Sequence, residues 1–84
     1  LSDSDNGQVL MFNNSSAITV TVPAGLTLGF ACTILQLGTG QITFSASSTT
    51  INNRNSHTKT AGQHSRVGLM HYSTDVYNLG GDTA

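Results

Sequence analysis

The sequence predicts an all-β domain, namely a small antiparallel β-sandwich or β-prism-like module, and three observations support this. Residues 16–23 alternate Ile18, Val20 and Val22 with threonines, which is the period-two pattern of a half-buried strand. No segment carries a helical stripe of apolar residues longer than one turn. Threonine, serine, asparagine and glycine abound, whereas strong helix formers are scarce.

A length of 84 residues is typical of a single domain, which we place at residues 8–84 after a lead-in linker at residues 1–7. Cys32 is the only cysteine, so no disulfide can form within the chain. No Cys/His set has the spacing of a zinc site, and we expect no cofactor. Because a monomer of this size buries only ~60–65 % of its unfolded surface, self-association is the remaining common source of stability.

Charge is sparse in this chain. Charged residues make up 8 % of it and the net charge is −1, which argues against nucleic-acid binding because that function needs a basic patch. No apolar run reaches the ~18–20 residues of a membrane span, so no membrane insertion is expected. The first residues lack the basic-then-apolar pattern expected of a signal peptide, and the single cysteine suits synthesis in a reducing compartment.

Short apolar segments separated by turn-forming residues give the order of the expected strands. The segment at 31–37 is apolar on both faces, which is typical of a central strand or of one at an interface. The glycine-rich residues 38–40 predict a tight turn that joins it to the next strand in a hairpin. Residues 52–62 are polar enough for an exposed loop, and no internal repeat is evident. The expected strands are residues 8–12, 16–23, 31–37, 41–45, 65–72 and 76–79.

An ordered series of short motifs gives the chain a family resemblance. A turn-rich start at residues 2–7 leads to a short strand and then to the alternating strand at residues 16–23. A later strand ends in residues 36–44, Gln-Leu-Gly-Thr-Gly-Gln-Ile-Thr-Phe, and residues 61–65, Ala-Gly-Gln-His-Ser, precede the penultimate strand. With the final apolar strand and Gly81-Asp82, this order resembles the small β-rich modules at the C-terminal ends of bacteriophage tail fibres and tailspikes.

The resemblance implies a homotrimeric virion component, assembled in the cytoplasm of the bacterial host, that ties three chains together at the distal end of a fibre. It also implies that the chain is the C-terminal fragment of a longer fibre protein. Some modules of this kind contact bacterial surface polysaccharide or lipopolysaccharide. Related sequences often carry a tryptophan in the last strand, where this chain has Tyr77, and it has no tryptophan at all.

The proposed trimer needs strand faces that one chain cannot cover by itself. The two-sided apolar strand at residues 33–37 and the last hairpin, residues 67–79, are the best candidates for such faces. The predicted interface residues are Thr33, Ile34, Leu35, Leu37, Val67, Leu69, Tyr77 and Leu79.

A dedicated saccharide-binding module is the alternative function. Amides and a guanidinium offer directional hydrogen bonds to sugar hydroxyls, and tyrosines offer flat apolar faces to sugar rings. The competing interpretation is an exposed loop with tyrosines packed in the core or between subunits. The predicted glycan-binding residues are Asn52, Asn53, Arg54, Asn55, His57, Lys59, Tyr72 and Tyr77.

Catalysis is not expected. The chain lacks a Gly-x-Ser-x-Gly elbow, and a glycosidase needs two carboxylates about 5–9 Å apart. Outside the lead-in the only acids are Asp75 and Asp82, which are better explained as a turn residue and a tail residue. A small glycan hydrolase therefore remains only a third alternative.

A metal site is not expected either. His57, His64 and His71 recur every seven residues, but an odd interval on strands alternates between the two faces. The one exception to consider is His71, which a three-fold axis would present three times to a metal ion or an anion. The competing interpretation is a hydrogen-bonded imidazole.

Overall fold

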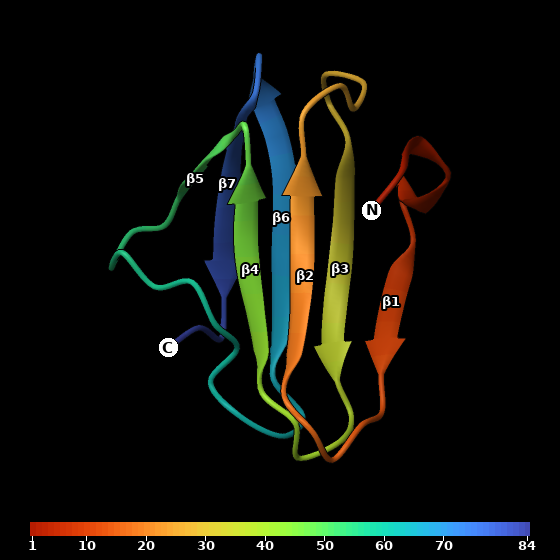
Figure 1. Ribbon diagram of the computed structural model, residues 1–84, viewed down its shortest axis with the longest axis vertical. Coiled ribbons are helices and arrows are strands. Elements are labelled where there is room, and N and C mark those ends of the chain that lie inside the picture. Colours follow the sequence, from red (N-terminus) through yellow and green to blue (C-terminus); the bar gives the residue numbers. More distant parts are fainter.

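The computed structural model describes all residues, 1–84, and confirms the all-β prediction (Figure 1). Its only helical segment is a three-residue 3-10 turn, η1 (Asp3–Asp5). Six of the strands lie where the sequence predicts them, and β5 is an additional short one. The strands are β1 (Val9–Phe12), β2 (Ile18–Pro23), β3 (Ala31–Gln36), β4 (Ile42–Ser47), β5 (Thr50–Asn52), β6 (Arg66–Ser73) and β7 (Val76–Gly81).

The strands form two sheets that share one hydrophobic core. The larger sheet has five strands in the order β1-β3-β6-β7-β5, and the smaller has only β2 and β4. In Figure 1 the two-stranded sheet lies across the larger one, while β1 stands at the side, outside that overlap. The core is made of side chains from both sheets: Val20, Val22, Phe30, Cys32, Ile34, Ile42, Phe44, Val67, Leu69, Tyr77 and Leu79.

The prediction of a purely antiparallel domain is wrong. Strand β1 pairs with β3, β2 with β4, and β5 with β7 in parallel, whereas only the β3–β6 and β6–β7 pairs are antiparallel. The hairpin expected at residues 38–40 does not form, because β3 and β4 belong to different sheets. The hairpin between β6 and β7 is present, as predicted.

The chain winds through the two sheets as two stacked coils. From β1 it crosses to β2 in the other sheet, returns to β3 beside β1, and crosses again to β4 beside β2. Val9 pairs with Thr33 and Ile18 with Ile42, and each pairing is 24 positions along the chain. We call β1 with β2 the first coil and β3 with β4 the second coil. The prediction that the chain lacks an internal repeat therefore misses a structural one.

Glycines allow the two coils to stack closely where they turn between sheets. A Cβ atom added at Gly38 would overlap the backbone of Asn14, and one added at Gly40 would overlap the backbone of Ser16. These glycines are therefore required by close approach of two backbones, and the hairpin that the sequence suggested does not explain them.

The lead-in residues are attached to the domain. The backbone N–H of Thr27 donates to Asp3 Oδ1 over 2.8 Å, and that of Ala31 donates to Asn6 Oδ1 over 3.0 Å. Leu1 packs against the hydrophobic core. Residues 1–7 thus belong to the folded unit, although the sequence suggested a linker.

Candidate interaction surface

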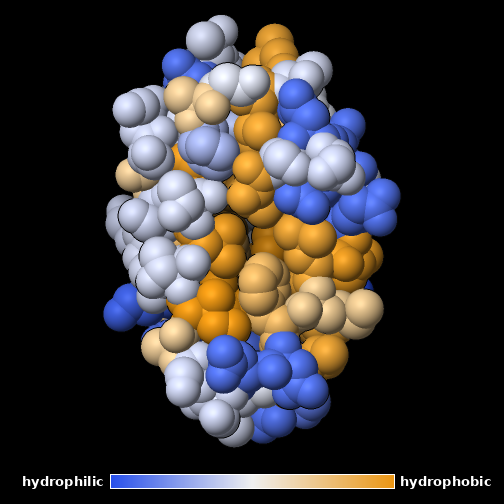
Figure 2. All heavy atoms as spheres, turned by 45° about the vertical axis from the view of Figure 1, so that its right-hand side comes forward, coloured by the Kyte–Doolittle hydropathy of each residue, from blue (hydrophilic) through white to orange (hydrophobic).

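An apolar hollow lies between β1 and the free edge of β2. Each of these strands has a neighbour on one side only. Figure 2 shows apolar residues gathered along the middle of this side, around a hollow, with hydrophilic residues above and below. We call this hollow the β1–β2 groove. It has a volume of about 640 Å³ and is lined by Leu1, Asp5, Val9, Leu10, Met11, Phe12, Thr19, Val20 and Thr21.

Two of the five large apolar side chains that the subunit exposes lie on β1. Val9 is 55 % exposed and Met11 is 64 % exposed. Leu10 and Phe12, which point toward the core, are only half-buried. Neither β1 nor β2 contains a charged residue, although charges commonly protect free strand edges from pairing. This side of the molecule therefore has both the apolar surface and the unprotected edges of a contact site.

The backbone groups at both edges are directed outward. The carbonyls of Gln8 and Phe12 accept hydrogen bonds from β3 or the residue after it, and alternate residues of a parallel strand bond to the same neighbour. The N–H and C=O groups of Val9 and Met11 therefore point away from β3. The Ile18 N–H donates to the Gln41 carbonyl beside β4. By the same alternation Thr19 and Thr21 direct their backbone groups to the free edge of β2.

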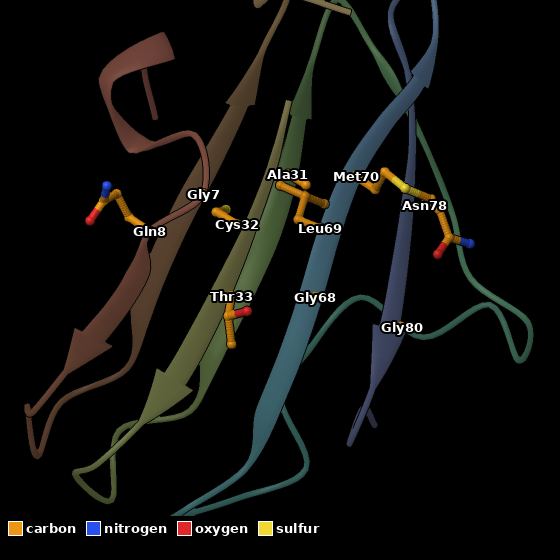
Figure 3. Close-up of a pocket in the computed structure, with 10 residues that line it drawn as sticks. All are labelled: Gly7, Gln8, Ala31, Cys32, Thr33, Gly68, Leu69, Met70, Asn78 and Gly80. Carbon is orange, nitrogen blue, oxygen red and sulfur yellow. The ribbon is translucent and has the colours of Figure 1, made fainter. Parts of the chain in front are cut away.

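A second hollow lies on the outer face of the five-stranded sheet (Figure 3). One cross-strand row contains Val9, Thr33, Gly68 and Gly80. The two glycines leave a trough of about 580 Å³ whose rim includes Met70 and Asn78. A Cβ atom added at Gly68 would meet no atom within 4 Å, so packing within the subunit does not demand glycine there.

Most of the predicted interface residues are already buried inside the single subunit. Five of them point into the shared core and are at most 1 % exposed: Ile34, Val67, Leu69, Tyr77 and Leu79. Strand β3 is not two-sided, because its alternate residues face the core and the outside. The remaining predicted residues, Thr33, Leu35 and Leu37, are half-buried.

The predicted glycan-binding residues do not form one cluster. Asn52 and Tyr72 are both exposed and meet directly, with Asn52 Nδ2 donating to Tyr72 Oη over 3.0 Å. Lys59 lies instead beside β4 of the two-stranded sheet, where it pairs with Thr43. Arg54 and Asn55 are exposed on the loop after β5.

Asn53 and His57 organise that loop. The side-chain oxygen of Asn53 accepts the backbone N–H groups of Asn55 and His57, and its Nδ2 donates to the Leu79 carbonyl. His57 Nδ1 lies 3.0 Å from the hydroxyl of Thr83. These two side chains therefore hold the loop against the end of β7.

Tyr77 is a core residue and cannot offer its ring to a sugar. It is fully buried, stacks on His71 with ring centroids 4.5 Å apart, and donates from its hydroxyl to the Pro23 carbonyl. Burial is the main cause that raises the pKa of its phenol, and the carboxylate of Asp75 adds to it.

The imidazole of His71 is engaged on both sides. Its Nδ1 lies 3.1 Å from the Thr27 carbonyl and therefore donates, while its Nε2 accepts the Asp75 backbone N–H over 3.0 Å. The ring is also buried, so it has no nitrogen free for a metal ion on a three-fold axis. No three His, Cys, Asp or Glu side chains gather closely enough to hold a metal ion.

The two candidate acids have local structural roles. Asp75 occupies the turn between β6 and β7 with a positive φ of 56°, as expected of a turn residue. The carboxylate of Asp82 accepts a hydrogen bond from the hydroxyl of the buried Ser65.

Comparisons with known proteins give no identification: no family model, no curated protein and no solved structure matches this chain. No helix of the structure is long and apolar enough to cross a membrane.

The β1–β2 groove is the feature that sequence reasoning missed. Its signal is present in the uncharged run Val-Leu-Met-Phe of β1 and in the uncharged strand β2, which together form two free edges.

Proposed function

We propose that this chain is a structural interaction module that assembles as a homotrimer and stabilises the distal end of a bacteriophage tail fibre or tailspike. The observation that carries the proposal is the uncovered apolar side of the subunit along β1, where two large side chains are more than half exposed. The order of short motifs that resembles fibre-end modules supplies the biological setting.

The size of the core supports the need for assembly. Only 17 of the 84 residues are buried in the single subunit, and the one cysteine is unpaired. A small domain without disulfides or a structural metal gains stability most readily by covering apolar surface with further copies. A three-fold assembly of such subunits gives the prism-like form that the sequence suggested.

The mass of the species in solution tests this function. We expect a trimer at micromolar concentration, and a melting temperature that rises with protein concentration because assembly stabilises only the folded state. A folded monomer whose melting temperature is independent of concentration would end the proposal.

Saccharide binding is a second candidate, favoured by one contact. The Asn52 amide donates to the Tyr72 hydroxyl on an exposed surface, where an amide offers directional hydrogen bonds to sugar hydroxyls and the tyrosine ring offers a flat apolar face. Tyr72→Ala should then abolish binding to bacterial surface polysaccharide and leave the trimer intact. Arg66→Ala is the matched control, since Arg66 is exposed at the opposite end of β6 from Tyr72 and is not a predicted glycan-binding residue. Unchanged binding by Tyr72→Ala would remove this candidate, and no turnover of the polysaccharide is expected.

A further inference from the structure

We infer that β1 of one copy pairs with the free edge of β2 in the next copy, antiparallel, around an axis that runs along the strands. This inference rests on the proposed self-assembly and names the surface that performs it. The occupant of the β1–β2 groove is therefore a second copy of this chain, which contributes its own β1.

The unequal sheets lead to this geometry. The subunit has five strands in one layer and two in the other, and β1 stands at one side, outside the part of the large sheet over which β2 and β4 lie (Figure 1). If β1 of a second copy joins β2, the five-stranded sheet of that copy continues the two-stranded sheet of the first. The added sheet then lies over the half-buried Leu10 and Phe12 and covers them.

Strand direction fixes the sense of the pairing. In Figure 1, β1 and β2 run in opposite directions. A rotation axis parallel to the strands leaves every strand direction unchanged, so β1 of the second copy meets β2 antiparallel. Antiparallel pairing is the more stable arrangement per residue.

The two edges are chemically suited to each other. The outward backbone groups of Val9 and Met11 on β1 can meet those of Thr19 and Thr21 on β2, and both strands are uncharged. No like charges therefore oppose the contact, and no proline interrupts either strand before Pro23 at the end of β2. The other free edge of the large sheet, β5, is only three residues long, which makes it a poorer partner.

Within one subunit the second coil stacks closely on the first coil. A coil from another copy cannot stack in the same way on the opposite side of the first coil. The stacking of the two coils requires Gly38 and Gly40, but the equivalent positions of the first coil are Asn14 and Ser16. Their side chains would overlap the backbone of an identical further coil. Pairing at the strand edges avoids this obstacle, because it does not bring a second turn against Asn14 and Ser16.

The contact joins two different surfaces, β1 and β2, so each copy has one of each to offer. Such a head-to-tail contact closes into a ring when the rotation is a fraction of a full turn. Three copies give a three-sided prism in which the inner faces of β1 surround the axis.

Proline variants test the pairing without removing hydrogen bonds inside the subunit. Met11→Pro and Thr21→Pro each delete one outward N–H, whereas the matched controls Met11→Val and Thr21→Val keep it. We expect each proline variant to remain folded by circular dichroism and to raise the dissociation constant of the trimer by about 100-fold or more. The valine controls should assemble like the original chain.

A mixed cross-link gives a second, independent readout. Chains carrying Met11→Cys are refolded together with chains carrying Thr19→Cys or Thr21→Cys and then oxidised. Cross-strand neighbours on one face of a sheet are close enough for a disulfide, so linked dimers are expected from the mixture and not from either variant alone.

The outcomes separate the inference from the function on which it rests. A trimer that survives both proline changes, or a mixture that gives no cross-link, overturns the β1–β2 pairing but leaves the homotrimer proposal standing. An original chain that is monomeric removes both. If a proline variant fails to fold, the cross-link decides.

Discussion

The two sides of this subunit differ in how completely they are sealed. Around the β6–β7 hairpin the inward side chains of Val67, Leu69 and Leu79 are each 1 % exposed, and the polar groups of His71 and Tyr77 have partners. Around β1 the inward side chains are only half-buried and the outward ones lie open to solvent.

The difference shows which part of the fold is self-sufficient. The inner face of the hairpin is sealed within the subunit, whereas Met70 and Tyr72 are 47 % and 49 % exposed on its outer face. The β1 side has the same apolar character but lacks a covering layer within the subunit, and in the proposed assembly a second copy would supply that layer. Changes on the first side should affect folding, and changes on the second should affect assembly.

The largest effect is expected from Tyr77→Ala on the sealed side. Removing a fully buried ring that stacks on His71 should reduce the free energy of unfolding by about 3–5 kcal/mol, measured by urea denaturation. Tyr72→Ala is the control, because Tyr72 is 49 % exposed and should change stability by less than about 0.5 kcal/mol. Similar losses from both tyrosines would contradict this division of the molecule.

A pair of glycine variants distinguishes the stacked coils from the outer face. Gly40→Ala places a methyl group against the backbone of Ser16 and should cost about 1–3 kcal/mol of unfolding free energy. Gly68→Ala places it in open space and should be neutral or stabilising by up to about 1 kcal/mol, since glycine weakens a strand. Thermal denaturation of both proteins tests the contrast, and equal destabilisation would count against the coil packing.

The thiol of Cys32 should be protected in the folded chain. Burial, with a further contribution from Asp5, raises its pKa from 9.0 to about 11. Because the folded-state pKa is the higher one, this group adds stability below pH 9.0 that is lost as the pH rises toward about 11. A thiol reagent at about pH 8 should react with the unfolded chain and hardly at all with the native one. Fast labelling of native protein would show that this part of the core is open.

The smallest effect is expected from Asn52→Ala at the exposed contact with Tyr72. A solvent-exposed hydrogen bond should contribute less than about 0.5 kcal/mol to stability. Urea titration against the original chain measures it, and a loss above 1 kcal/mol would mean that the contact has a structural role that its exposure conceals.

The sequence predicts strand positions well because alternation is a local property. The alternating β2 and the β6–β7 hairpin with its turn at Asp75 follow from neighbouring residues alone. The division of strands between two sheets does not, because the residues around Gly38 and Gly40 look like a hairpin turn until the backbone of the first coil is placed beside them.

The candidate site could be predicted only in part, for a similar reason. Gln36 at the end of β3 is buried, and its side-chain oxygen accepts a hydrogen bond from Thr60, which lies far along the chain. The polar character of Gln36 alone would have placed it on the exposed side of the strand. The aromatic ring of Tyr77 suggests a surface for sugar binding, but its position in the fold makes it a core residue. Which apolar strand is left uncovered depends on how many strands each sheet contains, and no local pattern encodes that number.

The mass of the assembled chain in solution tests the central claim most directly. Sedimentation at micromolar concentration should give a particle of three times the mass of one chain, which falls to a single chain when Met11→Pro blocks the edge of β1. A stable, folded particle with the mass of one chain, formed by the unaltered sequence, would contradict the account.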